Sequence, residues 1–491
     1  MLFNTFVFVF VFLPLALFGY YVISKYSLRY SVFFLFLASL VFYSYWKVVF
    51  LPLLLGSIAA NYFFGKKISE YTELNDDKSA KYFLTLSLIF NLGLLAFFKY
   101  ADFFLGFIAA LFDYPFTPFG VTLPIGISFF TFTQIAYLVD CRVAKIKEYK
   151  PENYGLFVTY FPHLIAGPIL HHKDMMPQFD QVKSHVFSGS RLLVGSLYFL
   201  IGLFKKVVLA DGVSKFVGPI FDVNYASLTP LEAWCGALAY TFQLYFDFSA
   251  YSEMAYGLSY MFGIILPINF NSPYKSKSII EFWRCWHITL STFLRDYLYI
   301  ITLGGNRRGF FRRYFNLLLT MLLGGLWHGA NFTFVIWGGL HGIYLIINHA
   351  IRNALNGRKH ALITFMGWLL TFAAVVLAWV LFRANNLSIA LQILRAMFAG
   401  TFTPGDGDYL MGLNRIMSID ECLAWLGLTA AISFFAPNTY ELLGVGIRER
   451  LELRLQGLFG GLVMGAVMVM SILLVLISET VGVSEFLYFN F

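Results

Sequence analysis

The sequence has few charged residues and few cysteines. Asp, Glu, Lys and Arg make up 13% of its 491 residues, whereas an ordinary soluble domain carries about 25%. The four cysteines, Cys141, Cys235, Cys285 and Cys422, form no CxxC pair and no His/Cys cluster. The sequence therefore predicts neither a structural zinc site nor a disulfide framework. We expect the four thiols to be packing residues in apolar surroundings.

Apolar residues stand where charges are missing. Hydrophobic residues make up 59% of the chain, aromatic residues 20%, and 57 residues are Phe; the mean hydropathy is +0.71. A water-soluble fold of this size could not hide so many rings, so we expect an integral membrane protein in contact with lipids. The formal net charge of +8 does not indicate a nucleic-acid partner, because Lys and Arg gather in short loops, as they do on the cytoplasmic side of membranes.

A membrane span needs roughly 20 apolar residues, so the chain has room for about ten to twelve. The candidates are 5–24, 30–47, 48–64, 81–99, 117–139, 190–210, 228–250, 314–327, 331–350, 362–384, 422–438 and 457–478. Gly and Pro interrupt several of them, which predicts tilted, broken or re-entrant segments. Residues 5–24 lack a positive region and a cleavage site, so we interpret them as a retained span.

The fold class that follows is an all-α polytopic membrane protein with about 11 transmembrane helices plus re-entrant and interfacial helices. Without a long polar linker or an internal repeat, residues 1–491 are expected to form a single domain. The basic loops should be cytoplasmic, and the N-terminus and a mostly acidic loop should lie outside. The acidic loop holds Asp406, Asp408, Asp420 and Glu421, and the basic ones include Arg142, Lys145, Arg307, Arg308, Arg312, Arg313, Arg448, Arg450 and Arg454.

Residues 160–172 break the membrane pattern. Pro162, Gly167 and Pro168 do not fit in one straight helix, and His163, His171 and His172 lie alongside them. Two interpretations stay open: a broken helix that dips into the protein, or a kinked span with interfacial histidines.

Residues 281–297 are amphipathic if they form one helix. At about 100° per residue, one side of that helix carries Glu281, Arg284, His287, Ser291 and Arg295. The segment could line an aqueous funnel in which the guanidinium groups face an anionic ligand such as a nucleotide phosphate. From the pattern alone, an interfacial helix whose Arg residues meet lipid head groups is favoured.

Residues 320–342 place His328 between two strongly apolar runs. An ionisable residue at membrane depth suggests function, although a histidine hydrogen-bonded between helices is the common alternative. Gly324, Gly325 and Gly329 would allow close backbone approach beside it. His341 is interpreted as a packing histidine that bonds a backbone carbonyl.

Asp247 belongs to a polar stripe with Gln243 and Tyr251 at i, i+4 spacing. We expect it to hold a partner cation or to orient a helix, rather than to act in catalysis. Asn269, Asn271, Pro273 and Tyr274 predict a turn ahead of the amphipathic segment.

These segments together resemble the membrane-bound O-acyltransferase (MBOAT) family, in the branch of the alginate O-acetyltransferase membrane subunit. The resemblance covers roughly residues 1–480, and its motifs follow family order: Leu123–Phe132, Phe161–Pro168, Gln243–Ser249, Phe282–Ser291, Arg295–Tyr299, Gly304–Arg307 and Gly324–Gly329. One departure is Cys285, where family members usually have a second Arg.

The resemblance implies helices around a central tunnel in a bacterial inner membrane. His328 matches the catalytic histidine of the family, and His287 matches its second histidine. An acyl thioester, here acetyl-CoA, would donate from the cytoplasm, with no bound cofactor and no metal. A separate periplasmic acetyltransferase would assist transfer to alginate, or alternatively to cellulose, peptidoglycan or teichoic acid.

A neutral imidazole can take the proton of a hydroxyl that attacks a thioester. We therefore predict His328 as the general base, and His287 as the residue that orients the acceptor or helps stabilise the oxyanion. Arg284 and Arg295 are candidate contacts for the donor's phosphates. No Ser or Cys stands in a nucleophile motif, so direct transfer is favoured over an acyl-enzyme. A transporter or flippase and a scaffold are the rival functions; no second copy of residues 282–329 supports the transporter's inverted repeat.

Overall fold

The computed structural model describes residues 1–148, 150–181, 186–222, 228–307, 309–355, 360–399, 419–444 and 457–487. Throughout these residues the secondary structure is helical, with no strand, so the all-α prediction is confirmed. The chain divides into two compact units. The first comprises Met1–Leu203, Tyr251–Ile268 and Leu443–Asn490, and the second comprises Phe204–Ala250 and Asn269–Leu442. The prediction of a single domain stays a prediction.

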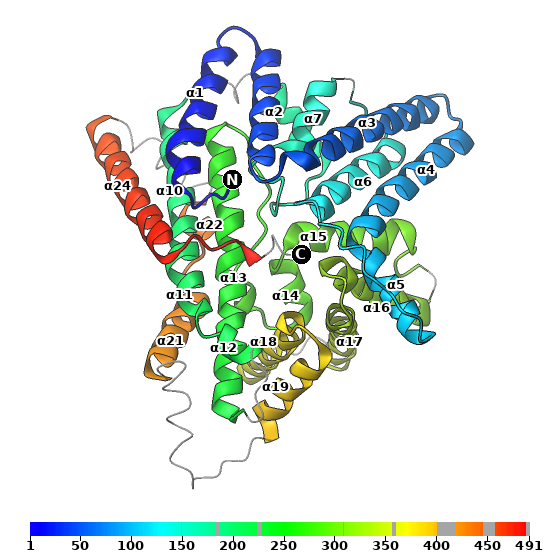
Figure 1. Ribbon diagram of the computed structural model, residues 1–491, viewed down its shortest axis with the longest axis vertical. Coiled ribbons are helices and arrows are strands. Elements are labelled where there is room, and N and C mark those ends of the chain that lie inside the picture. The colour runs from blue at the N-terminus through cyan, green and yellow to red at the C-terminus, as the bar shows by residue number, and fades with distance from the viewer. Residues whose placement is uncertain are drawn as a thin grey trace. The chain divides into compact units, whose positions relative to one another are not determined.

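The first unit contains most of the N-terminal half and the last long helix. Its elements are η1 (Val7–Phe12), α1 (Leu13–Ser24), α2 (Leu28–Ser44), η2 (Val48–Phe50), α3 (Leu51–Glu73), α4 (Asp77–Leu95), η3 (Ala96–Tyr100), α5 (Ala101–Leu111), α6 (Ile127–Val143), α7 (Pro151–Thr159), α8 (His172–Phe179), α10 (Gly189–Phe204) and α24 (Gly457–Val481). α1 packs on α2, and α3, α4 and α6 pack on one another (Figure 1). α10 meets α24 through Leu193 and Val467.

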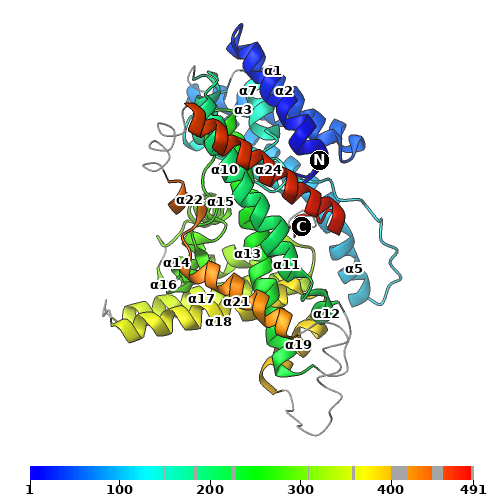
Figure 2. The same ribbon diagram turned by 90° about the vertical axis from the view of Figure 1, so that its left-hand side faces the viewer.

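The second unit contains shorter helices and one long hairpin. Its elements are η4 (Lys205–Ala210), α11 (Asp211–Ser214), α12 (Gly218–Phe221), η5 (Pro273–Lys275), α14 (Ile279–Cys285), α15 (Ile288–Phe293), η6 (Leu294–Thr302), α16 (Phe310–His328), α17 (Phe332–Leu355), α18 (Ala361–Arg383), α19 (Leu387–Ala399), α21 (Ile419–Phe435) and α22 (Thr439–Leu442). α17 packs against both α16 and α18 (Figure 2). The long helix α13 (Pro230–Met261) contributes residues to both units.

Seven helices in the described part of the chain are long and apolar enough to cross a membrane: Val7–Ser24, Val48–Glu73, Asp77–Leu111, Gly189–Ser214, Phe332–Ala354, Ala361–Arg383 and Gly460–Val481. The chain is thus a multi-pass membrane protein. The other five predicted spans each overlap with a helix (α2, α6, α13, α16 and α21). The count of about eleven spans stays a prediction.

One predicted span starts later than expected. Residues 117–126 are not helical, and α6 begins only at Ile127. The reason is the spacing of Pro118, Gly120, Pro124 and Gly126, which disfavours a helix, and Gly126 has a φ of +72°. A Cβ there would also lie 2.8 Å from the carbonyl oxygen of Leu164. The predicted span at 117–139 is therefore wrong in its first ten residues.

The interruption predicted at residues 160–172 is confirmed. α7 ends at Thr159, turns follow, and α8 begins at His172. His163 is buried, and its Nε2 lies 3.0 Å from the carbonyl oxygen of Phe157. The structure thus favours the broken helix over a kinked continuous span.

The thiols of Cys141, Cys235 and Cys422 are buried and free, as predicted, and Cys285 is partly buried.

The predicted membrane orientation stays a prediction. Several of the charges behind it lie outside the described residues, namely Arg308, Asp406, Asp408, Arg448, Arg450 and Arg454.

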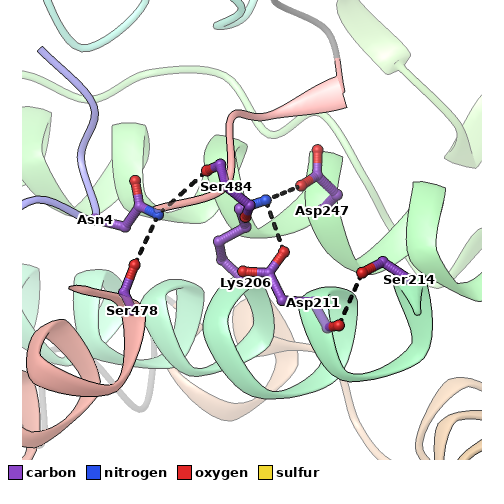
Figure 3. A network of polar contacts seen from close by, with 7 residues as sticks. All are labelled: Asn4, Lys206, Asp211, Ser214, Asp247, Ser478 and Ser484. Atoms are coloured by element: carbon purple, nitrogen blue, oxygen red, sulfur yellow. Dashed lines mark hydrogen bonds and ion pairs between the residues drawn. The ribbon is translucent and has the colours of Figure 1, made fainter. Parts of the chain in front are cut away.

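Polar contacts connect separate segments within each unit (Figure 3). In the first unit, the amide of Asn4 donates to Ser478 Oγ at 3.2 Å and so ties the N-terminal segment to α24. In the second unit, Lys206 Nζ donates to Asp247 at 2.8 Å and to Asp211 at 2.9 Å. The prediction that Asp247 holds a cation is confirmed.

Candidate active site

The amphipathic segment is two helices rather than one. α14 ends at Cys285 and α15 begins at Ile288, and His287 between them has φ 43° and ψ 55°. A left-handed conformation at a residue other than Gly is strained, and such residues concentrate at functional sites. The single helix predicted over 281–297 is therefore wrong, and so is the shared face. His287 is fully buried, whereas Arg284 and Arg295 are exposed.

Asn269 holds this bend in place. Its backbone carbonyl accepts from the Ile288 N–H at 2.9 Å, and its side-chain oxygen accepts from the N–H and hydroxyl of Thr289 at 3.2 and 3.0 Å. His287 Nδ1 lies 3.2 Å from the same oxygen. Because that oxygen can only accept, Nδ1 carries the proton, and a neutral His287 presents its lone pair at Nε2. The predicted turn at 269–274 thus serves to position His287.

His287 is packed among aromatic rings. The Phe248 ring lies 4.7 Å away, edge to face, and the Trp327 ring 6.3 Å away. His287 lies outside the candidate spans. Burial lowers the pKa of His287 to about 3, because an apolar environment disfavours the charged form. The imidazole is therefore neutral near pH 7 and able to accept a proton or a hydrogen bond.

His328 is the last residue of α16. The helix ends there because Gly329 is extended, with φ −167° and ψ 153°. The His328 ring is buried and lies 4.9, 5.2 and 5.1 Å from the rings of Trp327, Trp337 and Phe382. Trp327 contacts both His328 and His287. The structure thus brings the two histidines predicted from the sequence into one aromatic cluster.

Small residues let α16 and α17 approach closely beside His328. A Cβ on Gly325 would collide with the carbonyl oxygen of Phe334, and one on Gly338 with the carbonyl oxygen of Met321. At Gly329 a Cβ would collide with the Phe334 ring, whereas Gly324 faces only the tip of a Leu side chain at 3.1 Å. The close backbone approach predicted for this glycine-rich stretch is confirmed at Gly325.

His341 belongs to the same cluster. It is fully buried, and its ring lies 4.8 Å from that of Trp337, which also contacts His328. Trp283 Nε1 donates to His341 Nδ1 at 3.3 Å, so the predicted bond to a backbone carbonyl is wrong. The sequence carried one signal: Trp337 and His341 are four residues apart, on one face of α17. The donor, Trp283, comes from another helix.

The two arginines lie elsewhere on the second unit. Arg284 lines a groove of about 1120 Å³ between α14, α17 and α18, which also contains Lys277, Glu281 and Arg352 beside a mostly apolar wall. Arg295 is exposed and forms an ion pair with Asp296, with N–O distances of 2.6 and 3.0 Å. No group of three or more His, Cys, Asp or Glu side chains that could hold a metal ion occurs among the residues described. The roles proposed for the four site residues stay predictions.

Comparison with known proteins gives a family and several relatives. A model of the membrane-bound O-acyltransferase family (MBOAT) matches residues 1–391, which include His287, His328 and His341. A peptidoglycan O-acetyltransferase of Helicobacter pylori is 46% identical over 424 residues, covering 81% of this chain and 80% of the relative. A probable alginate O-acetylase of Pseudomonas aeruginosa is 44% identical over 404 residues, covering 81% and 75%. A teichoic acid D-alanyltransferase of Streptococcus thermophilus is 29% identical over 235 residues, covering 46% and 57%.

Proposed function

Because this chain belongs to the membrane-bound O-acyltransferase family, we propose that it passes an acetyl group from cytoplasmic acetyl-CoA across a bacterial inner membrane to an exported polysaccharide such as alginate. That it is a multi-pass membrane O-acyltransferase is already established by the family match and the helices. The rival functions, transport without chemistry and a passive scaffold, are therefore set aside. What we propose beyond this is the identity of the acyl donor, of the acceptor, of the partner protein and of the membrane.

The observation that carries the chemistry is that His287 and His328 both contact the ring of Trp327. A hydroxyl is a poor nucleophile at neutral pH, and a neutral imidazole within hydrogen-bond reach can take its proton as it attacks. We assign that role to His328. His287, whose Nδ1 faces Asn269 and whose Nε2 carries the lone pair, orients the attacking hydroxyl by accepting its hydrogen bond.

The proposed step balances without another reactant. The acceptor hydroxyl forms a C–O bond to the thioester carbon, and His328 takes the hydroxyl proton. The tetrahedral intermediate then breaks its C–S bond, and the proton passes from His328 to the departing thiolate. This direct transfer needs no acyl-enzyme.

For the donor, Arg284 is the arginine with the better setting. It shares its groove with Lys277 and Arg352, and clustered cations suit the phosphates of acetyl-CoA. Arg295, whose guanidinium already bonds Asp296, remains the second candidate contact. The groove and the histidine cluster share α14, because Arg284 lines the first and Trp283 contacts the second.

Two acceptors are supported by relatives. The 44% identity to a probable alginate O-acetylase supports alginate, and the 46% identity to a peptidoglycan O-acetyltransferase supports peptidoglycan as a second candidate. Teichoic acid has weaker support, since the D-alanyltransferase match covers only 46% of the chain. For any of these exported polymers, a separate periplasmic acetyltransferase is proposed as the partner that completes delivery.

The test supplies labelled acetyl-CoA to inside-out membrane vesicles and counts label in the polymer and free thiol in solution. His328→Ala should lower both by about 10²–10⁴-fold, the usual contribution of a general base. His349→Ala is the matched control: this histidine is also on α17's hairpin but contacts Arg313 at 3.2 Å, and its loss should leave transfer unchanged. Undiminished transfer in His328→Ala would remove His328 from the chemistry.

A further inference from the structure

Three ring nitrogens are buried together next to His328 without a hydrogen-bond partner among the described residues. They are His341 Nε2, Trp337 Nε1 and Trp379 Nε1, and each side chain is at most 1% exposed. The Trp337 ring lies 4.8 Å from the His341 ring and 5.6 Å from the Trp379 ring. The His341 and Trp379 rings are 6.3 Å apart. We call these three residues the donor cluster.

All three nitrogens are hydrogen-bond donors. An indole Nε1 carries a hydrogen and has no lone pair to offer. His341 Nδ1 accepts from Trp283 Nε1 at 3.3 Å, and an accepting Nδ1 requires the neutral tautomer with its hydrogen on Nε2. The donor cluster therefore presents three N–H groups and no acceptor. Buried donors without a partner are unfavourable, so a hydrogen-bond acceptor is expected to bind to them.

The two indoles of the cluster do not satisfy each other. Trp337 and Trp379 are stacked, with their planes 18° apart, and an indole N–H lies in the plane of its ring. Neither N–H can therefore point at the face of the other indole. A group that accepts hydrogen bonds and that enters the cluster from outside the chain is the simplest way to pair these donors.

The position of the donor cluster indicates which hydrogen-bond acceptor binds there. Trp337 contacts both His341 and His328, with ring centres 4.8 and 5.2 Å away. Any acceptor oxygen bound there lies beside the proposed general base. In acyl transfer the base must reach the proton of the attacking hydroxyl, and the oxygen that N–H donors near the base must hold is the carbonyl oxygen of the acyl group.

We propose that His341, Trp337 and Trp379 bind the carbonyl oxygen of the acyl thioester. The inference rests on the proposed function and adds to that function a binding site for the reacting carbonyl. A carbonyl oxygen has two lone pairs, whereas the oxyanion formed when the hydroxyl attacks has three. The cluster would thus bind the tetrahedral intermediate better than the thioester, which is the requirement for catalysis by such donors. His287 is then left to orient the acceptor.

The experiment compares two ligands of the full-length protein in lipid nanodiscs. One is acetyl-CoA and the other is the thioether S-ethyl-CoA, which has a methylene in place of the carbonyl. If the donors hold the carbonyl, the unaltered protein should bind acetyl-CoA about tenfold more tightly than the thioether, since each hydrogen bond contributes roughly two- to tenfold in affinity. Trp337→Phe and Trp379→Phe should each reduce that ratio to about fivefold, and His341→Phe combined with Trp337→Phe should bring it to about twofold.

Two further variants separate a binding role from a structural one. His341→Gln keeps an N–H donor and should retain more of the ratio than His341→Phe. Trp368→Phe is the matched control on α18, because its N–H already donates to the carbonyl oxygen of Tyr274 at 3.0 Å. It should weaken both ligands equally or neither. A variant that merely loosens the fold likewise lowers both affinities together and leaves the ratio intact.

The outcomes are distinct. Equal binding of the two ligands by the unaltered protein, or a ratio that survives loss of the donors, would overturn the inference while leaving acetyl-CoA as the donor. Failure of both ligands to bind would overturn the proposed donor, and the carbonyl site with it.

Discussion

Replacing Asp247 with Asn should destabilise the protein by about 3 kcal/mol. Lys206 Nζ lies 2.8 Å from Asp247 Oδ1, and both side chains are 2% exposed. Two unit charges 4 Å apart attract by about 4 kcal/mol at an effective dielectric constant of 20, and by roughly 6 kcal/mol at 2.8 Å. Desolvation of both charges offsets much of this, yet removing one partner leaves the other charge buried, which typically costs about 3–5 kcal/mol. Because Asp211 still holds Lys206 at 2.9 Å, we expect the lower end of that range.

The assay is unfolding in mixed micelles of increasing SDS content, followed by circular dichroism. A double-mutant cycle with Lys206→Met should give a coupling energy of roughly 2–3 kcal/mol. The control pair is Lys150 and Asp180, which has nearly the same separation, 2.7 Å, but side chains 52% and 55% exposed. Its coupling energy should be below about 1 kcal/mol.

Equal coupling energies for the buried and the exposed pair would refute the reasoning, because the attraction between two charges should be stronger where solvent does not screen it. A cost below about 1 kcal/mol for Asp247→Asn would refute it as well. A functional effect should accompany the instability. Asp247 precedes Phe248, whose ring packs edge to face against His287 at 4.7 Å, so a shift of α13 would disturb His287.

Two further predictions use the same unfolding assay. Gly338→Ala should cost about 1–3 kcal/mol of stability, because its Cβ would collide with the carbonyl oxygen of Met321. Gly93→Ala is the control: a Cβ there has nothing within 4 Å, so the change should be neutral or stabilising by up to about 1 kcal/mol. Equal effects of the two substitutions would contradict this prediction. Burial lowers the pKa of His287 to about 3 from 6.5, so between those values the unfolded chain binds more protons and acid favours unfolding. His287→Asn should therefore lose less stability than the unaltered protein between about pH 7 and pH 5, and an unchanged pH dependence would argue against a neutral buried His287.

Hydropathy predicted the helices better than it predicted their partners. The long apolar runs appear as helices because they satisfy their own backbone hydrogen bonds, which is a local property of the sequence. That Asp247 needs a cation also follows from its apolar surroundings. The identity of the cation does not follow from the sequence pattern. It is Lys206, 41 residues earlier in the chain, because η4 packs against α13 at this point. Periodicity carries no information about such contacts.

The same limit explains the outcome for the histidines. His328 was identified by its isolation between two apolar runs and by the family resemblance, and no contact was needed. His341 was interpreted as a packing residue because its helix is apolar around it. Its functional interest comes from Trp283 and Trp379, on two other helices, and from three donors that have no acceptor among the described residues.

The bend at His287 shows why the amphipathic pattern misled. Residues 281–297 satisfy the periodicity of one helix, and a continuous helix would have turned His287 toward the same side as Arg284 and Arg295. The helix breaks because Asn269, 18 residues earlier, offers acceptors to Ile288 and Thr289 that replace the bonds of the missing turn. The cost is a left-handed backbone at His287, of order 1–3 kcal/mol. A fold that only needed an amphipathic helix would not retain that strain. It is explained if the bend exists to withdraw one imidazole from the charged face and set it against Trp327, beside His328.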